Sequence, residues 1–331
     1  MADVEVVTAD GTALLAAPVW DVFATARGTA FHMGRFLRCW WQDTVAKNPA
    51  SRLLAAQVVD GGRTVGVCAF ELASGVLSFA GGCDVVDYMG PLAAAGREKE
   101  VAAALAEWVF DQVPWTRAHF AGLVHSDPTT QALAAEVARR APSATVETYD
   151  QAPRIEHAPD GYLPLLNSKR RADVLRKRNR LVEAVGELEL VVSTRETVLD
   201  SLERLLAWKC DAGPATHDFV AEYGGFLRAM LADLAAADAG HVVELWASGR
   251  PLAAAIMLQH QNIDYIYNMA YDMAFTTGDH AGLAPGVVLV SLLVERSLDR
   301  GARFDFLKGA QDYKLRLGGV PVDLIGITVE R

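Results

Sequence analysis

Two residues near the end of the chain have side chains suited to group-transfer chemistry. The stretch "ARFDFLKGAQDYK" contains Asp305 and, a short way downstream, Lys314. A carboxylate can accept a proton from an amine, and an ammonium group can stabilise a developing oxyanion or a phosphate. We therefore predict catalytic roles for Asp305 and Lys314. The alternative interpretation is a structural Asp–Lys ion pair at the edge of a sheet.

A second stretch, "GLAPGV", has the features of a phosphate cradle. Pro285 suits the first position of a helix, because its fixed φ fits and its missing N–H would have no partner there. Gly282 and Gly286 allow backbone to approach a ligand closely, and the N–H groups of the first helical turn attract anions. The alternative is that Pro285 only starts a helix and the glycines only fill a turn. The residues predicted to bind a cofactor phosphate here are Gly282, Leu283, Ala284, Pro285, Gly286 and Val287.

These residues need a strand on each side to hold them together. The run "IDYIYNMAYD" reads as a strand that ends just before the cradle, where open α/β folds usually bind ligands. The helix predicted over 285–300 follows. The next strand, "ARFDFL", alternates so that Phe304 and Phe306 face one side and Asp305 the other.

The same order of elements occurs twice in the chain. Residues 53–72 and 242–258 both read as hairpins, with turns at Asp60-Gly61-Gly62 and Ser248-Gly249-Arg250. After the first hairpin come the strand "GVLSFAGG", a helix over 96–112 and the strand "RAHFAGLV". The repeat predicts two α/β units. Because 151–167 is rich in Pro, Asp and Gly, we predict domains 1–155 and 156–331, with helices near 168–186, 195–209 and 218–237 in the second.

Composition and motifs exclude several classes of function. The chain has 41 acidic and 31 basic residues, a net charge of -10, which disfavours DNA or a membrane surface as partner. Its four cysteines show no metal or redox spacing, so no metal is expected. The start "MADVEVVTAD" lacks a secretory pattern and no apolar run is long enough to span a bilayer, which predicts a cytoplasmic protein. Dinucleotide, Walker, serine-hydrolase and zinc-protease motifs are lacking, and the sequence is silent on oligomeric state.

Several stretches, taken in order, resemble one known family. The succession "YNMAYD", "APGVVL" and "RGARFDFLKGAQDYK" resembles the C-terminal signature of the cellulose-biosynthesis (BcsL-type) acetyltransferases, a GNAT superfamily branch similar to the Fem-type peptidyltransferases. The stretches "GVLSFAGGCDVVDYMGPL" and "SKRRADVLRKRNRLV" resemble two further segments of that family, so the resemblance runs from about Val19 to Lys314. It implies tandem GNAT-like units, each a mixed, mostly antiparallel sheet flanked by helices.

The resemblance also implies an activity and a cofactor. It implies an N-acyltransferase that moves an acyl group, such as acetyl, from acyl-CoA to an amine of a small molecule or sugar. The CoA pyrophosphate would lie at the amides of about Leu283 to Val287, Lys314 would act near donor and acceptor, and no metal would be needed. Leu317 stands where the family usually has an aromatic residue, so the resemblance does not indicate which residue forms the wall of the acceptor pocket. The alternatives are a Fem-type aminoacyl or peptidyl transferase that uses a charged tRNA, and a non-catalytic GNAT-like binding module.

A short basic segment concentrates positive charge in this acidic chain. Between Lys169 and Arg180 there are seven Lys or Arg residues and one acid. In a helix, the side chains of Val174, Leu175, Leu181, Val182 and Val185 would form one apolar stripe, with Arg176 and Arg180 facing solvent. Arg178 falls within the stripe and would need a carboxylate or phosphate partner, so we name it as a cofactor-binding residue. The open interpretations are a solvated face, an anchor for the nucleotide end of CoA or an anionic acceptor, and a site for the acceptor stem of tRNA.

Five further residues are predicted to contact the acceptor amine or other substrate groups. Asp87 and Tyr88 follow the first unit's aromatic strand, and a cleft shared by both units would let Asp87 act as a base. The alternative for Asp87 is a turn cap before Gly90-Pro91. Tyr271 and Asp272 raise the same question in the second unit. His217 is predicted to lie in a loop between helices, as a mobile base or as a merely exposed side chain.

Overall fold

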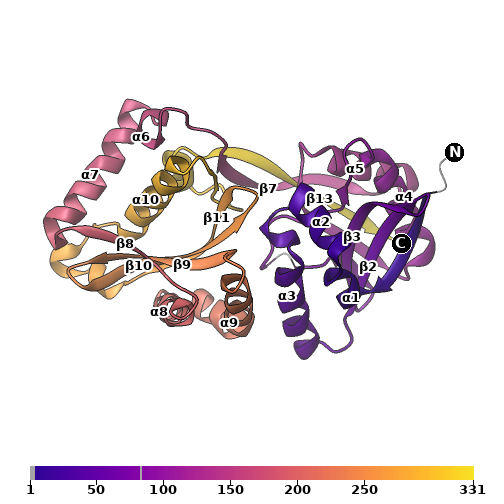
Figure 1. Cartoon of the computed structure of the whole chain (residues 1–331), viewed down its shortest axis with the longest axis horizontal. Coiled ribbons are helices and arrows are strands. Elements are labelled where there is room, and N and C mark those ends of the chain that lie inside the picture. Colours follow the sequence, from indigo (N-terminus) through magenta and orange to yellow (C-terminus); the bar gives the residue numbers. More distant parts are fainter. Residues whose placement is uncertain (1–3, 83) are drawn as a thin grey trace. The chain divides into compact units, whose positions relative to one another are not determined.

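The structure, a computed structural model, describes residues 4–82 and 84–331 and divides the chain into two compact units (Figure 1). The first unit holds the chain up to Gln151 together with Val322–Arg331, and the second is Ala152–Pro321. Each contains a mixed, mostly antiparallel sheet with helices packed on it, as the repeat in the sequence predicted. The units differ from the predicted domains 1–155 and 156–331 chiefly in the last ten residues, which belong to the first unit.

The first unit has the sheet order β1-β2-β3-β4-β6-β13, in which only β4 and β6 run parallel and β5 pairs with β3. The strands are β1 (Val4–Asp10), β2 (Arg52–Asp60), β3 (Arg63–Ala73), β4 (Val76–Phe79), β5 (Leu92–Ala93), β6 (Arg117–Val124) and β13 (Val320–Glu330). The helices are α1 (Gly11–Leu15), α2 (Pro18–Arg27), η1 (Ala30–His32), α3 (Gly34–Lys47), α4 (Glu98–Gln112) and α5 (Pro128–Arg140).

The second unit has the order β7-β12-β11-β10-β9-β8, in which only β11 and β12 run parallel and to which β7 contributes residues 152–155. Helices α8 and α9 cover one face of this sheet, and α7 and α10 cover the other (Figure 1). The strands are β7 (Thr145–Ile155), β8 (Leu188–Val192), β9 (Gly240–Ala247), β10 (Arg250–His260), β11 (Ile263–Tyr271) and β12 (Arg303–Asp305). The helices are α6 (Tyr162–Leu165), α7 (Ser168–Val185), α8 (Val198–Asp211), α9 (Pro214–Ala235), η2 (Ala274–Thr276), η3 (Gly278–His280), α10 (Pro285–Asp299) and α11 (Asp312–Arg316).

The two predicted hairpins form because their turns contain residues that accept positive φ. Gly61 and Gly62 have φ values of 55° and 78°, and Ser248 and Gly249 have values of 48° and 72°. Two consecutive left-handed residues make the tight turn whose twist matches that of paired strands. Glycine adopts this conformation without steric cost, so the sequence identified both turns correctly.

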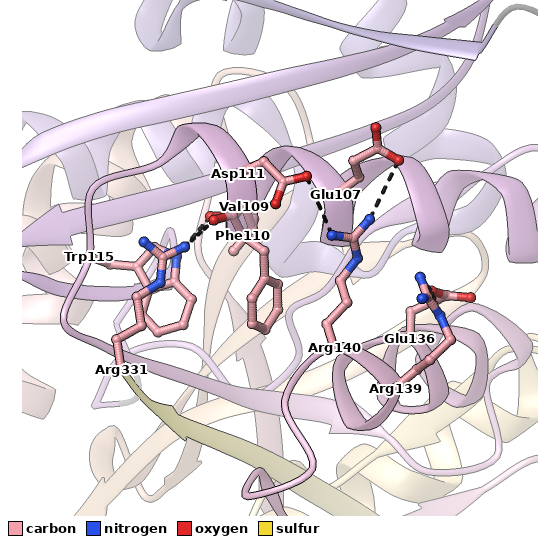
Figure 2. A network of polar contacts seen from close by, with 9 residues as sticks. All are labelled: Glu107, Val109, Phe110, Asp111, Trp115, Glu136, Arg139, Arg140 and Arg331. Atoms are coloured by element: carbon pink, nitrogen blue, oxygen red, sulfur yellow. Dashed lines mark hydrogen bonds and ion pairs between the residues drawn. The ribbon is translucent and has the colours of Figure 1, made fainter.

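The C-terminal strand β13 is held in the first unit by a polar and aromatic contact at its end (Figure 2). The Arg331 guanidinium lies over the Trp115 ring at 4.1 Å from the ring centroid and donates to the Phe110 carbonyl. Nearby, Arg140 of α5 is paired with Glu107 at 3.5 Å and Asp111 at 3.4 Å, both on α4. The contacts of Arg331 and the pairing of β13 with β6 explain why the chain's end belongs to the first unit.

The buried face of α7 is narrower than the sequence predicted. Val174 and Leu181 are buried in the core of the second unit, but Leu175 and Val182 are 38% and 42% exposed. The predicted five-residue stripe is therefore wrong at those two positions. At the buried face Arg178 bonds to Glu295 of α10, as its place within the predicted stripe requires.

No helix within 4–82 or 84–331 combines the length and the apolar character that a membrane crossing requires.

The stability of the second unit is predicted to fall in mild acid because of His241, a partly buried side chain on β9. Burial lowers the pKa of His241 from 6.5 to about 4, with nearby Arg296 and Arg300 also lowering it and Asp264 opposing them. Between these two pH values the unfolded chain binds a proton that the folded unit does not. Stability is thus lost as pH falls through this window, by up to about 3 kcal/mol.

Substitution of His241→Gln should shrink the difference in unfolding free energy between pH 7 and pH 4.5, measured by urea titration. His157→Gln, at an exposed position, is the control and should leave that difference unchanged. An equal acid sensitivity in wild type and His241→Gln would show that the effect has another origin.

Candidate functional site

The candidate site begins where two parallel strands of the second unit stop pairing. β11 and β12 are bonded over three residue pairs, the last being Tyr265 with Asp305. β12 then ends, whereas β11 continues to Tyr271. The register between β11 and β10 also shifts near Ile256 and Met257, which leaves Tyr267 as an extra residue in β11. Such a bulge bends a strand and is frequent beside ligand sites.

A cavity of about 380 Å³ lies at this opening. It is formed by the end of β11, the segment before α10, the first turn of α10 and a tyrosine from α11. All six residues predicted to form the phosphate cradle line it. The lining residues are Met269, Tyr271, Thr276, Gly282, Leu283, Ala284, Pro285, Gly286, Val287 and Tyr313.

The first turn of α10 presents backbone N–H groups to this cavity. Pro285 is the first helical residue, and Ala284 before it supplies no side-chain cap. The amide of Val288 donates to the Ala284 carbonyl at 3.0 Å, so the amides of Gly286 and Val287 precede the helix's own hydrogen bonds. The first turn contains no acidic residue. The positive end of the helix dipole is therefore available to an anion.

The glycines of the cradle serve two different purposes. Gly282 has a φ of 79°, a conformation that favours glycine, and a Cβ there would meet nothing within 4 Å. Gly286 instead packs tightly, since a Cβ would lie 2.8 Å from Met269 Cε and 3.2 Å from Tyr271 Cδ1. Gly286 thus lets the helix start against the end of β11.

Asp305 lies at the edge of this opening but is already fully engaged. Its side chain is buried, and its carboxylate pairs with Arg154 Nε at 2.8 Å and accepts from the Leu307 amide at 2.8 Å. Arg154 comes from β7, which pairs with β12 at this point. These two contacts fix the carboxylate to β7 and to the backbone of the turn that follows. The contacts therefore favour a structural role, with Arg154 as an ion-pair partner.

Lys314 lies on α11 and supports the turn that follows Asp305. The side chain is buried, and its ammonium group donates to the carbonyls of Leu307 at 3.1 Å and Lys308 at 2.7 Å. Leu307 has a φ of 61°, which is uncommon for a residue with a branched side chain. Asp305 and Lys314 thus hold Leu307 from opposite sides, through its N–H and its C=O. We name this group the Asp305–Lys314 clamp.

Tyr313, next to Lys314 in sequence, is the residue of α11 that lines the cavity. Burial raises the pKa of its hydroxyl, so the group stays protonated at neutral pH. Tyr313 was not among the predicted site residues, because the sequence pattern pointed to the charged Lys314 beside it. Leu317, where the sequence left the pocket wall open, is buried in the core and does not line the cavity.

Arg178 has protein partners that account for its buried position. Its guanidinium donates to Glu295 at 2.7 Å, to Ser291 Oγ at 3.0 Å and to the Ser291 carbonyl at 2.9 Å, all on α10. The required carboxylate is thus supplied by a neighbouring helix. Arg178 is not among the residues that line the cavity, and these contacts argue against its predicted role in holding CoA.

The remaining residues predicted to contact substrate in the second unit have different environments. Tyr271 lines the cavity. Asp272, directly after it, forms an ion pair with Arg250 and accepts from the Phe275 amide at 3.2 Å. The prediction that His217 lies in a loop is wrong, because α9 starts at Pro214 and places His217 in its first turn. Its exposed side chain lies 3.8 Å from Asp218, and Pro214 was the signal for the helix start.

Asp87 and Tyr88 belong to the first unit. Asp87 is partly buried, and Tyr88 is fully buried with its ring edge-on to Phe31 at 6.0 Å. Tyr88 lines a smaller cavity of about 70 Å³ in that unit, together with His32 and Thr130 among others. Their roles toward an acceptor stay predictions.

In the part of the chain that the structure describes, no three His, Cys, Asp or Glu side chains gather as metal ligands.

One family model matches the part of the chain that contains this cavity. Residues 168–315 match the family model of the acetyltransferase (GNAT) domain. No curated protein sequence matches the chain. The cavity and the start of α10 therefore lie within the segment that matches this domain model.

Three solved structures share the fold over nearly the whole chain. L-PGS from Bacillus licheniformis is 12% identical with a TM-score of 0.60, over 94% of this chain and 91% of that one. FemX is 11% identical with a TM-score of 0.59, over 93% and 94%. A tandem GNAT protein from the clavulanic acid biosynthesis pathway is 15% identical with a TM-score of 0.51, over 99% and 98%. The fold is thus that of tandem GNAT units, whereas such identities establish no substrate.

Arg178 is predicted to stabilise the packing of α7 on α10. Substitution of Arg178→Met leaves Glu295 and Ser291 without their donor and should lower the free energy of local opening of both helices by about 2 kcal/mol. Hydrogen exchange followed by mass spectrometry measures this directly. Arg180→Met, on the exposed side of the same helix, is the matched control and should change it by less than about 0.5 kcal/mol. Unchanged exchange with weaker acetyl-CoA binding would instead indicate a cofactor role.

Lys314 is predicted to act through the turn at Leu307. Substitution of Lys314→Met removes the donor of two carbonyls and should speed hydrogen exchange over 306–317, with a loss of about 2 kcal/mol in local stability. Arg316→Met, on the same short helix but 64% exposed at its side chain, should have little effect. If Lys314→Met abolished turnover while leaving exchange unchanged, Lys314 would be a catalytic residue and not a positioning one.

Proposed function

We propose that the second unit is an N-acyltransferase that takes an acyl group, acetyl in the first instance, from acyl-CoA and transfers it to an amine of a small molecule or sugar. The observation that carries the proposal is the cavity of about 380 Å³ into which the uncapped first turn of α10 and the free end of β11 both open. The match of residues 168–315 to the acetyltransferase (GNAT) domain supports it.

The donor's diphosphate fits the start of α10. The amides of Gly286 and Val287 can donate to phosphate oxygens, and the dipole of a 15-residue helix adds to the attraction. The absence of a first-turn acid avoids like-charge repulsion. The part of β11 beyond Tyr265 offers backbone groups on the side where β12 has ended, so an extended pantetheine arm can bond along it.

Acyl-CoA supplies the reaction with an activated thioester. The acceptor's nitrogen forms the new C–N bond as the C–S bond breaks, and the sulfur leaves as a thiolate that must take a proton. Tyr313 lines the cavity, and its raised pKa keeps a proton on its hydroxyl that can be donated toward that sulfur. Tyr271 and Met269 form the apolar wall against which the acyl group packs.

In this proposal the proton released by the acceptor amine passes to water. Among the cavity-lining residues that the structure describes there is no carboxylate or histidine, and the titratable side chains are Tyr271 and Tyr313. Asp305 and Asp272 are both held in ion pairs. Asp87, Tyr88 and His217 stay candidates for contact with an acceptor. Membership in the BcsL-type branch also stays a proposal.

A Fem-type transferase that takes its donor from charged tRNA is the second candidate. The observation in its favour is the basic start of α7, together with the fold that the chain shares with FemX. It requires RNA binding and no affinity for CoA. The third candidate is a non-catalytic binding module, which would bind a ligand without turnover.

The proposed diphosphate site is tested by placing a negative charge in it. Val287 is partly buried, lines the cavity and lies in the first turn of α10. Val287→Glu should weaken acetyl-CoA binding by at least about tenfold in calorimetric titration, because a carboxylate near the diphosphate repels it. Val287→Gln has the same size without the charge and should weaken binding by less than about threefold.

Two results would contradict the proposal. Wild-type protein that does not bind acetyl-CoA or longer acyl-CoAs would exclude them as donors. Equal losses in Val287→Glu and Val287→Gln would mean that the effect is steric and that the diphosphate lies elsewhere. Where a donor binds, a screen of amines with that donor identifies the acceptor.

A further inference from the structure

A second cavity of the second unit is surrounded by positive charge. This hollow, of about 560 Å³, lies where the start of α7 meets α11. Four cationic side chains surround it, three from α7 and one from α11. We name it the α7–α11 hollow. Its lining residues are Asn167, Lys169, Arg170, Ala172, Asp173, Arg176 and Arg316.

The cations of the hollow are only partly neutralised by protein. Arg176 pairs with Asp173, which also pairs with Lys177, and Arg316 pairs with Asp312 at 2.7 Å. Lys169 and Arg170 are exposed, and within 4–82 and 84–331 the structure gives neither side chain an acidic partner. The hollow therefore keeps an excess of positive charge in a chain whose net charge is -10.

These charges occupy an unfavourable place in their helix. Lys169, Arg170 and Arg171 are consecutive residues in the first turn of α7, which contains no acid. The positive end of a helix dipole repels cations there, each by a few tenths of a kcal/mol up to about 1 kcal/mol. A bound anion would offset that cost, because it interacts favourably with the dipole and with the cations.

The lining of the hollow indicates which anions it suits. Its volume is in the range of small-molecule sites, and guanidinium groups pair well with phosphate oxygens. None of the lining residues is aromatic, so the hollow has no platform on which a nucleic-acid base could stack. This chemistry favours a compact, multiply charged phosphate group over a single-stranded nucleic acid.

The hollow and the proposed acyl-CoA site share one short helix. Tyr313 of α11 lines the acyl-CoA cavity, and Arg316, one turn later, lines the hollow. Residues three apart on a helix have their Cβ atoms about 5 to 6 Å from each other. A molecule held in the hollow by its phosphate can therefore extend past α11 toward Tyr313.

We propose that the α7–α11 hollow is a second anion subsite, which binds a phosphate-bearing group of the acceptor. The acceptor of the transfer is then an amine that carries one or more phosphates. The assignment to the acceptor rests on the proposed function, whereas the anion subsite itself does not. The subsite and the start of α10 use different residues, so each is tested separately.

The test uses the full chain and inorganic tripolyphosphate as the probe, titrated by calorimetry with acetyl-CoA already saturating. Wild-type protein should bind the probe. The double variant Lys169→Glu with Arg170→Glu should bind it at least about tenfold more weakly, while its affinity for acetyl-CoA changes by less than about twofold. Both substitutions place acids in the first turn of α7, where the dipole favours them, so the fold should be retained.

A matched control separates local from overall charge. Arg63→Glu with Arg195→Glu makes the same change in net charge at exposed positions outside the hollow and should leave probe binding within about twofold. Val287→Glu should do the reverse of the first variant, weakening acetyl-CoA and not the probe. If acetyl-CoA fails to bind any form while the probe still binds at Lys169 and Arg170, the proposed function falls and the anion subsite stands.

Other results would overturn the subsite. Competition between tripolyphosphate and acetyl-CoA, with both weakened in the Lys169→Glu and Arg170→Glu variant, would assign the hollow to the donor's own phosphates. An equal loss of tripolyphosphate affinity in the control variant would mean that the probe responds to overall charge and not to the hollow. Absence of probe binding, combined with micromolar binding of an RNA hairpin that is lost in the first variant, would replace the phosphate-bearing acceptor by RNA.

Discussion

The early end of β12 at Asp305 is the constraint on which the site depends. If β12 continued beside β11, the parallel ladder would consume the backbone groups of β11 up to Tyr271 and close the cavity. The chain instead turns away through Leu307, in a conformation that costs free energy for a branched side chain. Arg154, Asp305 and Lys314 supply the buried ion pair and hydrogen bonds that hold this turn. Charge that looks catalytic in the sequence thus maintains the opening.

The opening has consequences for both ligands of the proposed reaction. It exposes the edge of β11 to the donor, and it lets α10 begin directly against Met269 and Tyr271 because Gly286 has no side chain. It also brings α11 to the rim, with Tyr313 toward the cavity and Arg316 toward the α7–α11 hollow. One short helix therefore links the clamp, the acyl site and the anion subsite.

Local patterns in the sequence predicted the elements whose partners are close along the chain. The two glycine turns fixed the hairpins and Pro285 fixed the start of α10, and the residues predicted to form the cradle line one cavity. Interactions between distant segments were missed. Arg154 lies about 150 residues before Asp305, and β13 pairs with β6 across some 200 residues, so no local pattern could reveal either. Leu175 was misassigned because helical periodicity shows which side chains share a face but not how much of that face the neighbouring elements cover.

A difference between the helix starts of the two units explains why the donor site is proposed for the second unit alone. Both contain a short parallel pair, β4 with β6 and β11 with β12, followed or bridged by a helix, and a cavity of about 190 Å³ adjoins β4 and β6 in the first unit. The helix starts differ, however. The first turn of α4 contains Glu98 and Glu100, whereas that of α10 contains no acid. Carboxylates at a helix start already use the dipole and would repel a diphosphate, so of these two helix starts that of α10 is the one suited to an anion.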